Sequence, residues 1–175
     1  MSTAESSPTH GNERAKDLFL TGLRNAHAME VQAAQTIETQ LGRYDSYPEL
    51  HARMAQDLAN SKAQAARLET LLAKHGSSES STKETITSFV GSIAGMVHVT
   101  APDQVIKDVL AAAGYKQYEI AAYTSLIAMA RAVGDTDCPA VLEQSLNEEQ
   151  EMADWLRENT AALATTFMRR YANPA

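Results

Sequence analysis

The chain has 175 residues, of which 44% are hydrophobic, which is enough for one globular domain with a sizeable core. Its net charge of −7 argues against nucleic-acid binding, because phosphate contacts need clustered Lys and Arg, and no apolar run is long enough to span a membrane. The single cysteine, Cys138, excludes an intramolecular disulfide, and the polar first residues do not resemble a signal peptide, so we expect a cytoplasmic protein.

The N-terminal part of the chain predicts a tail followed by a long helix. Residues 1–15 are rich in Ser, Thr, Gly and charge, and we expect them to be disordered. From Lys16 to about Gly42, apolar residues recur at spacings of three and four, which predicts an amphipathic helix that ends at the glycine. A turn over residues 44–48 follows, with Pro48 in the first turn of the next helix.

The second helix is predicted from Pro48 to His75, closed by Gly76. Its predicted apolar seam comprises Met54, Leu58, Ser61, Ala65, Leu68 and Leu72. The Ser-rich stretch 77–82 indicates a linker, because it offers no face to bury. The apolar piece 86–99 predicts a short helix that lies across the bundle, and its two glycines leave open a role as a surface for a partner.

Two further long helices complete the predicted domain. One runs from Pro102 to about Val133, and the other from Pro139 to about Tyr171, with a turn between them. Four long helices joined by short or polar connections predict an all-α four-helix bundle with an additional short helix, spanning residues 16–171.

Three glutamates stand inside the apolar stripes of three different helices: Glu30, Glu119 and Glu149. An ionised carboxylate on such a stripe needs a cation, a proton or several donors. Asp57 is expected one position off the seam of the second helix. Bundles hold iron or manganese through carboxylates that project inward, so these four residues are candidate metal ligands.

Lys116 lies on the same seam as Glu119, one turn earlier, and its ammonium can reach the carboxylates. It is therefore a candidate substitute for a metal ion. Four carboxylates and one ammonium carry a formal charge of −3, so the cluster must bind a proton, admit water or bind a cation. An ion-pair network without metal, a single metal ion and a complete dimetal centre all remain open.

Several stretches resemble the YciF group of bacterial stress-associated, ferritin-like proteins. They are HAMEVQ (27–32), DLANSKAQAARLE (57–69), YKQYEIAAYTSL (115–126) and LNEEQEMADWL (146–156). The resemblance covers about residues 16–165. It implies a dimeric four-helix bundle with a fifth short helix and a dimetal centre, whose acidic positions include Glu30, Glu119 and Glu149.

The match to that ligand set is partial. Asp57 stands where the group commonly has His, Asn60 where it commonly has Glu, and Lys116-Gln117 replace a Glu-His pair. No Glu-x-x-His occurs, and Met152 follows Glu149 at the histidine spacing. Two hypotheses follow. One is a non-catalytic homodimer with no metal or a single ion, and the other is an iron- or manganese-dependent oxidoreductase.

Other polar residues near these positions have simpler interpretations. Tyr123, one turn after Glu119, either donates its hydroxyl to a carboxylate or packs in the core. Glu148 is expected on the solvated face of its helix. His75 has no acidic neighbour at ligand spacing in the sequence, and Cys138, at a helix start, has no evident partner.

Overall fold

A computed structural model describes residues 8–76 and 103–173. Four long helices occupy these ranges: α1 (Pro8–Gln40), α2 (Pro48–Lys74), α4 (Gln104–Ala132) and α5 (Cys138–Ala172). A short 3-10 helix, η1 (Leu41–Tyr44), joins α1 to α2. The described residues contain no β-strand, so the predicted all-α, ferritin-like four-helix bundle is confirmed. The linker and the short helix predicted between residues 77 and 99 lie outside the described ranges.

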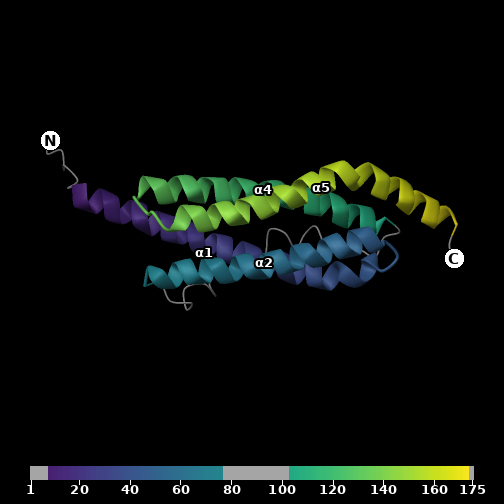
Figure 1. Ribbon diagram of the computed structural model, residues 1–175, viewed down its shortest axis with the longest axis horizontal. Coiled ribbons are helices and arrows are strands. Elements are labelled where there is room, and N and C mark those ends of the chain that lie inside the picture. Colours follow the sequence, from purple (N-terminus) through teal and green to yellow (C-terminus); the bar gives the residue numbers. More distant parts are fainter. Residues whose placement is uncertain (1–7, 77–102, 174–175) are drawn as a thin grey trace, which may run out of the picture.

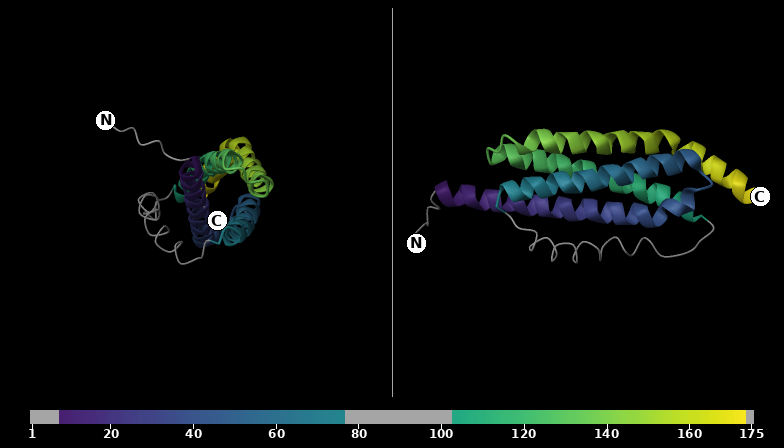
Figure 2. Two further views of the ribbon diagram at one scale, coloured as in Figure 1. Left: turned by 90° about the vertical axis from the view of Figure 1, so that its left-hand side faces the viewer. Right: turned by 60° about the horizontal axis from the view of Figure 1, so that its bottom comes forward.

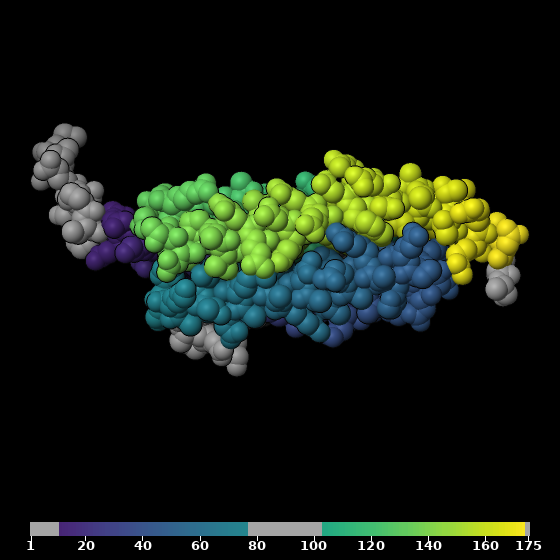
Figure 3. Space-filling view, in the orientation of Figure 1, coloured from purple at the N-terminus to yellow at the C-terminus, as the bar shows by residue number. Residues whose placement is uncertain are grey.

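The bundle consists of two antiparallel pairs, α1 with α2 and α4 with α5 (Figures 1 and 2). Arg43 in η1 contacts Asp108 near the start of α4, whereas His75 after α2 contacts Asp135 in the α4–α5 turn. The end of α2 and the start of α4 therefore lie at opposite ends of the bundle. Helices α2 and α4 therefore run in the same direction, as they do in a ferritin-like topology. Beyond the paired region, α5 continues past the other helices (Figure 3).

Two predicted helix boundaries were wrong. Helix α1 begins at Pro8 rather than Lys16, so residues 8–15 are helical and not part of a disordered tail. Residues 11–18 are exposed and carry no apolar stripe, but Glu13, Arg14 and Ala15 have high helix propensity and extend the helix without burial. At the other end, Gly42 lies within η1 and has no positive φ, because a 3-10 turn continues the chain.

The remaining turns follow the predicted chemistry. Pro48 lies in the first turn of α2, where its missing N–H has no cost. Gly76 closes α2 with a φ of 69°, and Gly134 begins the turn after α4 with a φ of 76°. Both are left-handed conformations that favour glycine. None of the described helices carries an apolar stretch of membrane-spanning length.

The core consists of two apolar clusters along the bundle axis. One surrounds Leu23, Leu68 and Leu126, and the other surrounds Met54, Met152 and Leu156. Between them the inward positions of all four long helices are polar. These buried polar residues are Glu30, Asp57, Ser61, Gln64, Lys116, Glu119, Ser145 and Glu149. The candidate site is therefore a polar layer in the middle of an apolar bundle.

The buried face of α2 matches the predicted seam at Met54, Ser61, Leu68 and Leu72 but differs at Leu58 and Ala65, which are half-buried. Asp57 is only 2% exposed, whereas Leu58, which we expected on the seam, is half-buried. The buried positions of α2 are Leu72 and a regular series that comprises Leu50, Met54, Asp57, Ser61, Gln64, Leu68 and Leu71. The members of this series alternate steps of four and three, which is the heptad spacing of bundle helices. This regular spacing brings Asp57 into the centre despite its polarity.

Candidate functional site

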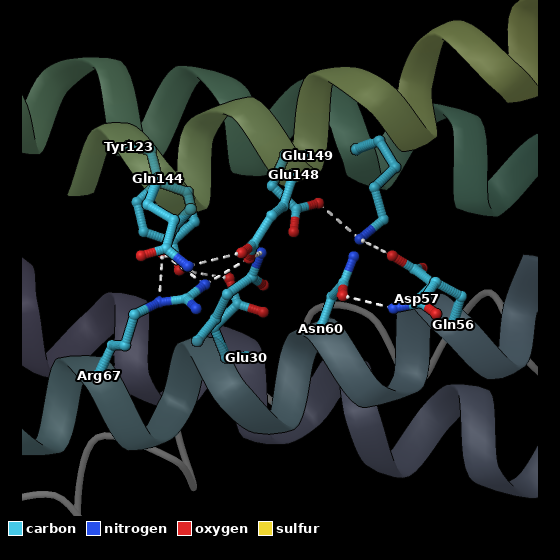
Figure 4. A network of polar contacts seen from close by, with 12 residues as sticks. Glu30, Gln56, Asp57, Asn60, Arg67, Tyr123, Gln144, Glu148 and Glu149 are labelled. Atoms are coloured by element: carbon cyan, nitrogen blue, oxygen red, sulfur yellow. Dashed lines mark hydrogen bonds and ion pairs between the residues drawn. The ribbon is translucent and has the colours of Figure 1, made fainter. Parts of the chain in front are cut away.

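Four carboxylates from four helices meet in the polar layer: Glu30 from α1, Asp57 from α2, Glu119 from α4 and Glu149 from α5. Each is at most 2% exposed. Asp57 and Glu149 project toward one another from facing helices (Figure 4). One oxygen from each of Glu30, Glu119 and Glu149 lies within 4.8 Å of the others. The structure thus brings together all four predicted site residues.

Lys116 enters this cluster as a buried cation. Its Nζ lies 2.6 Å from Glu149 Oε2, 2.8 Å from Glu119 Oε2 and 2.9 Å from Asp57 Oδ1. The side chain is 2% exposed. One ammonium therefore contacts three carboxylates from three helices, so it occupies a position in which a bound cation would have three oxygen ligands.

Among the ion pairs that the structure describes, Lys116 contacts the other three carboxylates but not Glu30. Its Oε1 accepts a hydrogen bond of 2.8 Å from the hydroxyl of Tyr123, whose side chain is fully buried. The hydroxyl of Tyr115 bonds to the carbonyl oxygen of Met29 at 3.1 Å, next to Glu30 in the chain. Of the two interpretations of Tyr123, the hydrogen-bonding one is confirmed, and the residue also packs in the apolar core.

In the described structure, each of the three glutamates has a carboxylate oxygen that accepts no hydrogen bond. Within the described part of the chain, no hydrogen-bond donor reaches Glu30 Oε2, Glu119 Oε1 or Glu149 Oε1. Buried carboxylate oxygens without donors are costly unless a proton or a cation is present. Because Glu119 and Glu149 each turn one oxygen to Lys116 and keep the other unpaired, the cluster contains two neighbouring positions for positive charge.

The electrostatics of the cluster follow from burial. Desolvation, and then the neighbouring Glu149, raise the pKa of Glu30 from its ordinary 4.5 to about 8. Burial also raises the pKa of Glu119 and Asp57, and Lys116 acts against that rise. Burial alone would lower the pKa of Lys116, but Glu119, Asp57 and Glu149 raise it well above 10.5. At neutral pH the lysine is therefore charged, and the raised pKa values of Glu30 and Glu119 favour a proton on the glutamates.

A second set of polar side chains, which come from α2 and α5, lies beside the carboxylate cluster. Arg67 forms an ion pair with Glu148 and donates to Ser145 Oγ at 3.2 and 3.3 Å. Gln64, which is fully buried, donates to Glu148 Oε2 at 3.0 Å. Figure 4 shows Arg67 and Glu148 reaching toward one another from facing helices. Glu148 was expected on the solvated face, but this pair holds it half-buried.

Sequence reasoning missed this flanking group because its members come from different helices. Asn60, at the position where the YciF group commonly has Glu, is half-buried, and its amide oxygen accepts a bond from Gln56 along the outer side of α2. The next residue, Ser61, occupies the buried heptad position. Ser61 was expected on the seam, and the heptad spacing was the signal that would have added Gln64 to it.

The donor set determines which metal could fit. A dimetal centre in this type of bundle uses one Glu from each of two helices and a Glu-x-x-His pair from each of the other two. Here Met152 lies at the histidine spacing after Glu149, buried in the apolar core, and the Lys116 ammonium lies among three of the carboxylates. Two metals therefore do not fit. One hard cation does fit at Glu30, Glu119 and Glu149, whose oxygens would hold it.

Comparison with known proteins identifies the family. Residues 14–169 match the family described as Domain of unknown function (DUF892). A crystal structure of a protein from Xanthomonas campestris pv. campestris is 27% identical, covers 89% of this chain and 97% of that chain, and has a TM-score of 0.74. The crystal structure of the E. coli stress protein YciF is 19% identical, covers 92% of this chain and 98% of that chain, and has a TM-score of 0.67.

The chain belongs to the DUF892 family, because the match covers most of its length. Together with the fold shared with YciF, this confirms the resemblance to the YciF group that the sequence motifs indicated.

Proposed function

We propose that this member of the DUF892 family is a ferritin-like stress protein whose central site contains a fixed lysine cation in place of one metal ion. The observation that carries the proposal is the contact of Lys116 Nζ with Asp57, Glu119 and Glu149 at 2.6–2.9 Å. In this account the cluster stabilises the bundle centre and does not perform dimetal redox chemistry.

An ammonium can replace the charge of a metal ion but not its redox chemistry. A divalent ion and an ammonium both neutralise buried carboxylates, but only the metal changes its oxidation state or activates a bound oxidant. The Lys116 ammonium is covalently attached and held by three oppositely charged partners, so an incoming metal ion would have to displace it. The second position for positive charge is then filled by a proton on the glutamates, as the raised pKa values of Glu30 and Glu119 favour.

A second candidate function is supported by one observation. The unpaired oxygens of Glu30, Glu119 and Glu149 leave room for a single iron or manganese ion beside the ammonium. Such an ion would supply one-electron chemistry with oxygen or peroxide. For this chain to act in that way, its glutamates would hold the ion, and Tyr123 would orient Glu30.

Metal analysis and an oxidation assay separate the two candidates. The purified protein is incubated anaerobically with excess Fe(II), desalted and analysed for iron, and oxygen consumption is then followed. The first candidate predicts at most one iron per chain and Fe(II) oxidation no faster than in buffer. Two irons per chain that are both lost in Glu119→Gln, with rapid Fe(II) oxidation, would refute it. One iron with peroxide consumption that is lost in Glu119→Gln would favour the second candidate.

We also propose that the protein is a cytoplasmic homodimer, as the family resemblance implies. Large apolar side chains such as Met168 and Tyr171 are more than half exposed on the C-terminal part of α5, which supports an association surface there. Sedimentation equilibrium should give twice the chain mass of 19.0 kDa, and a monomer at micromolar concentration would contradict this.

A further inference from the structure

A second cluster of metal-binding side chains lies at the end of the bundle, away from the carboxylate site. His75 follows the last turn of α2, Asp135 lies in the α4–α5 turn, and Cys138 is the first residue of α5. They are distant in sequence but meet because α2 ends beside that turn. The imidazole is partly exposed, the carboxylate less so, and the thiol is buried.

The three donor atoms converge. His75 Nε2 lies 3.0 Å from Asp135 Oδ2 and 3.6 Å from Cys138 Sγ, and one donor atom from each residue lies within 4.8 Å of the others. Two ligands of a tetrahedral zinc ion, with Zn–S of about 2.3 Å and Zn–N of about 2.0 Å, lie roughly 3.5 Å apart. The separation of the sulfur and the nitrogen is thus that of two ligands sharing one ion.

The surroundings orient these donors. The backbone N–H groups of Asp137 and Cys138 donate to Asp135 Oδ1 at 2.9 and 2.8 Å, which leaves Oδ2 directed at the imidazole. The ring of Phe19 packs edge-on against His75, with centroids 6.1 Å apart. Ligands of metal sites are commonly held by such outer contacts. The partly exposed imidazole gives an ion a path of entry from solvent.

Two other interpretations explain less. Asp135 caps the start of α5, but that role uses only Oδ1 and does not require the cysteine or the histidine. A nucleophilic Cys–His pair requires a thiol that a substrate can reach, whereas the thiol of Cys138 is buried.

We propose that His75, Asp135 and Cys138 form a site for a divalent transition-metal ion of the zinc type, with water as the fourth ligand. The donor set of one sulfur, one nitrogen and one oxygen favours such an ion over magnesium or calcium, which prefer oxygen alone. Binding replaces the thiol proton, so each ion bound releases one proton from sulfur. The ion joins the end of α2 to the α4–α5 turn.

Cobalt(II) spectroscopy tests the proposal, because a thiolate bound to Co(II) gives a near-ultraviolet charge-transfer band and carboxylates do not. The chain has one cysteine, so the band reports Cys138 alone. We expect a band that saturates at one Co(II) per chain, disappears when Zn(II) is added and is absent in Cys138→Ser. Absence of the band in the wild-type protein at excess Co(II) would overturn the proposal.

A second variant keeps the test decisive if Cys138→Ser folds poorly. His75→Gln removes a partly exposed ligand and should weaken Zn(II) binding about tenfold or more. The matched control is His51→Gln, because His51 also lies near a carboxylate, 3.7 Å from Asp45, but at the other end of α2. This control should leave the band and the zinc affinity unchanged. A band of equal strength in His75→Gln would mean that the imidazole is not a ligand and would also overturn the proposal.

Discussion

The protonated state of Glu30 predicts a specific pH dependence of stability. Its carboxyl has a pKa of about 8 in the folded protein and an ordinary value of 4.5 in the unfolded chain. The folded state therefore binds more protons than the unfolded state between these values. The contribution of Glu30 to stability is fully present below pH 4.5 and is lost as the pH rises toward 8.

The magnitude follows from the size of this window. A one-proton difference changes the free energy of unfolding by about 1.4 kcal/mol per pH unit. Between pH 5.5 and 7.5, Glu30 should thus lower the stability of the wild-type protein by roughly 2 kcal/mol. Glu30→Gln cannot ionise, so it should gain about that amount relative to the wild type over the same range.

Urea denaturation at pH 5.5 and 7.5, with a chelator present, measures this difference. Contributions of titrating groups outside the carboxylate cluster cancel between the two proteins. Glu38→Gln is the matched control, since Glu38 lies on the exposed face of the same helix and should keep the wild-type pH dependence. If Glu30→Gln and wild-type protein lose the same stability between the two pH values, Glu30 is ionised throughout and the reasoning is refuted.

Three further substitutions test the packing around the site. Tyr123→Phe removes the hydrogen bond to Glu30 and should lower the free energy of unfolding by about 1–3 kcal/mol in urea; an unchanged midpoint would show that the bond contributes nothing. Arg43→Ala leaves the buried Asp108 without its ion-pair partner and should cost about 1–3 kcal/mol, seen as a lower thermal midpoint. Leu156→Ala opens a cavity at a fully buried position and should cost about 2–5 kcal/mol, and a loss below 1 kcal/mol would contradict the packing.

The fold could be predicted from the sequence because its signals are local and repetitive. Heptad-like spacing on the α4 and α5 segments placed Lys116, Glu119 and Glu149 on the inner face, and the structure buries all three. On α2 the predicted seam is buried at Met54, Ser61, Leu68 and Leu72, but the sequence pattern favoured the apolar Leu58 over the adjacent Asp57, which is the buried residue. Periodicity, more than hydrophobicity, determined which of the two adjacent residues faces the centre.

The parts of the site that the sequence did not reveal depend on pairs of helices. His75 and Asp135 are 60 positions apart, and only the parallel direction of α2 and α4 brings them together. The distances from Lys116 to its three carboxylates could likewise not be derived from spacing on one helix, because they depend on how closely α2, α4 and α5 approach. Such contacts follow from tertiary packing, which helical periodicity alone does not determine.

The central claim is that the Lys116 ammonium occupies the position of a metal ion. Titration of chelator-treated protein with Mn(II) by calorimetry tests it directly, comparing wild type with Lys116→Met. Lys62→Met serves as the control, because Lys62 forms an exposed pair with Glu38. We predict that Lys116→Met binds one more Mn(II) per chain than the wild type, or binds it at least tenfold more tightly, and that the control matches the wild type. Equal Mn(II) stoichiometry and affinity in all three proteins would contradict the account.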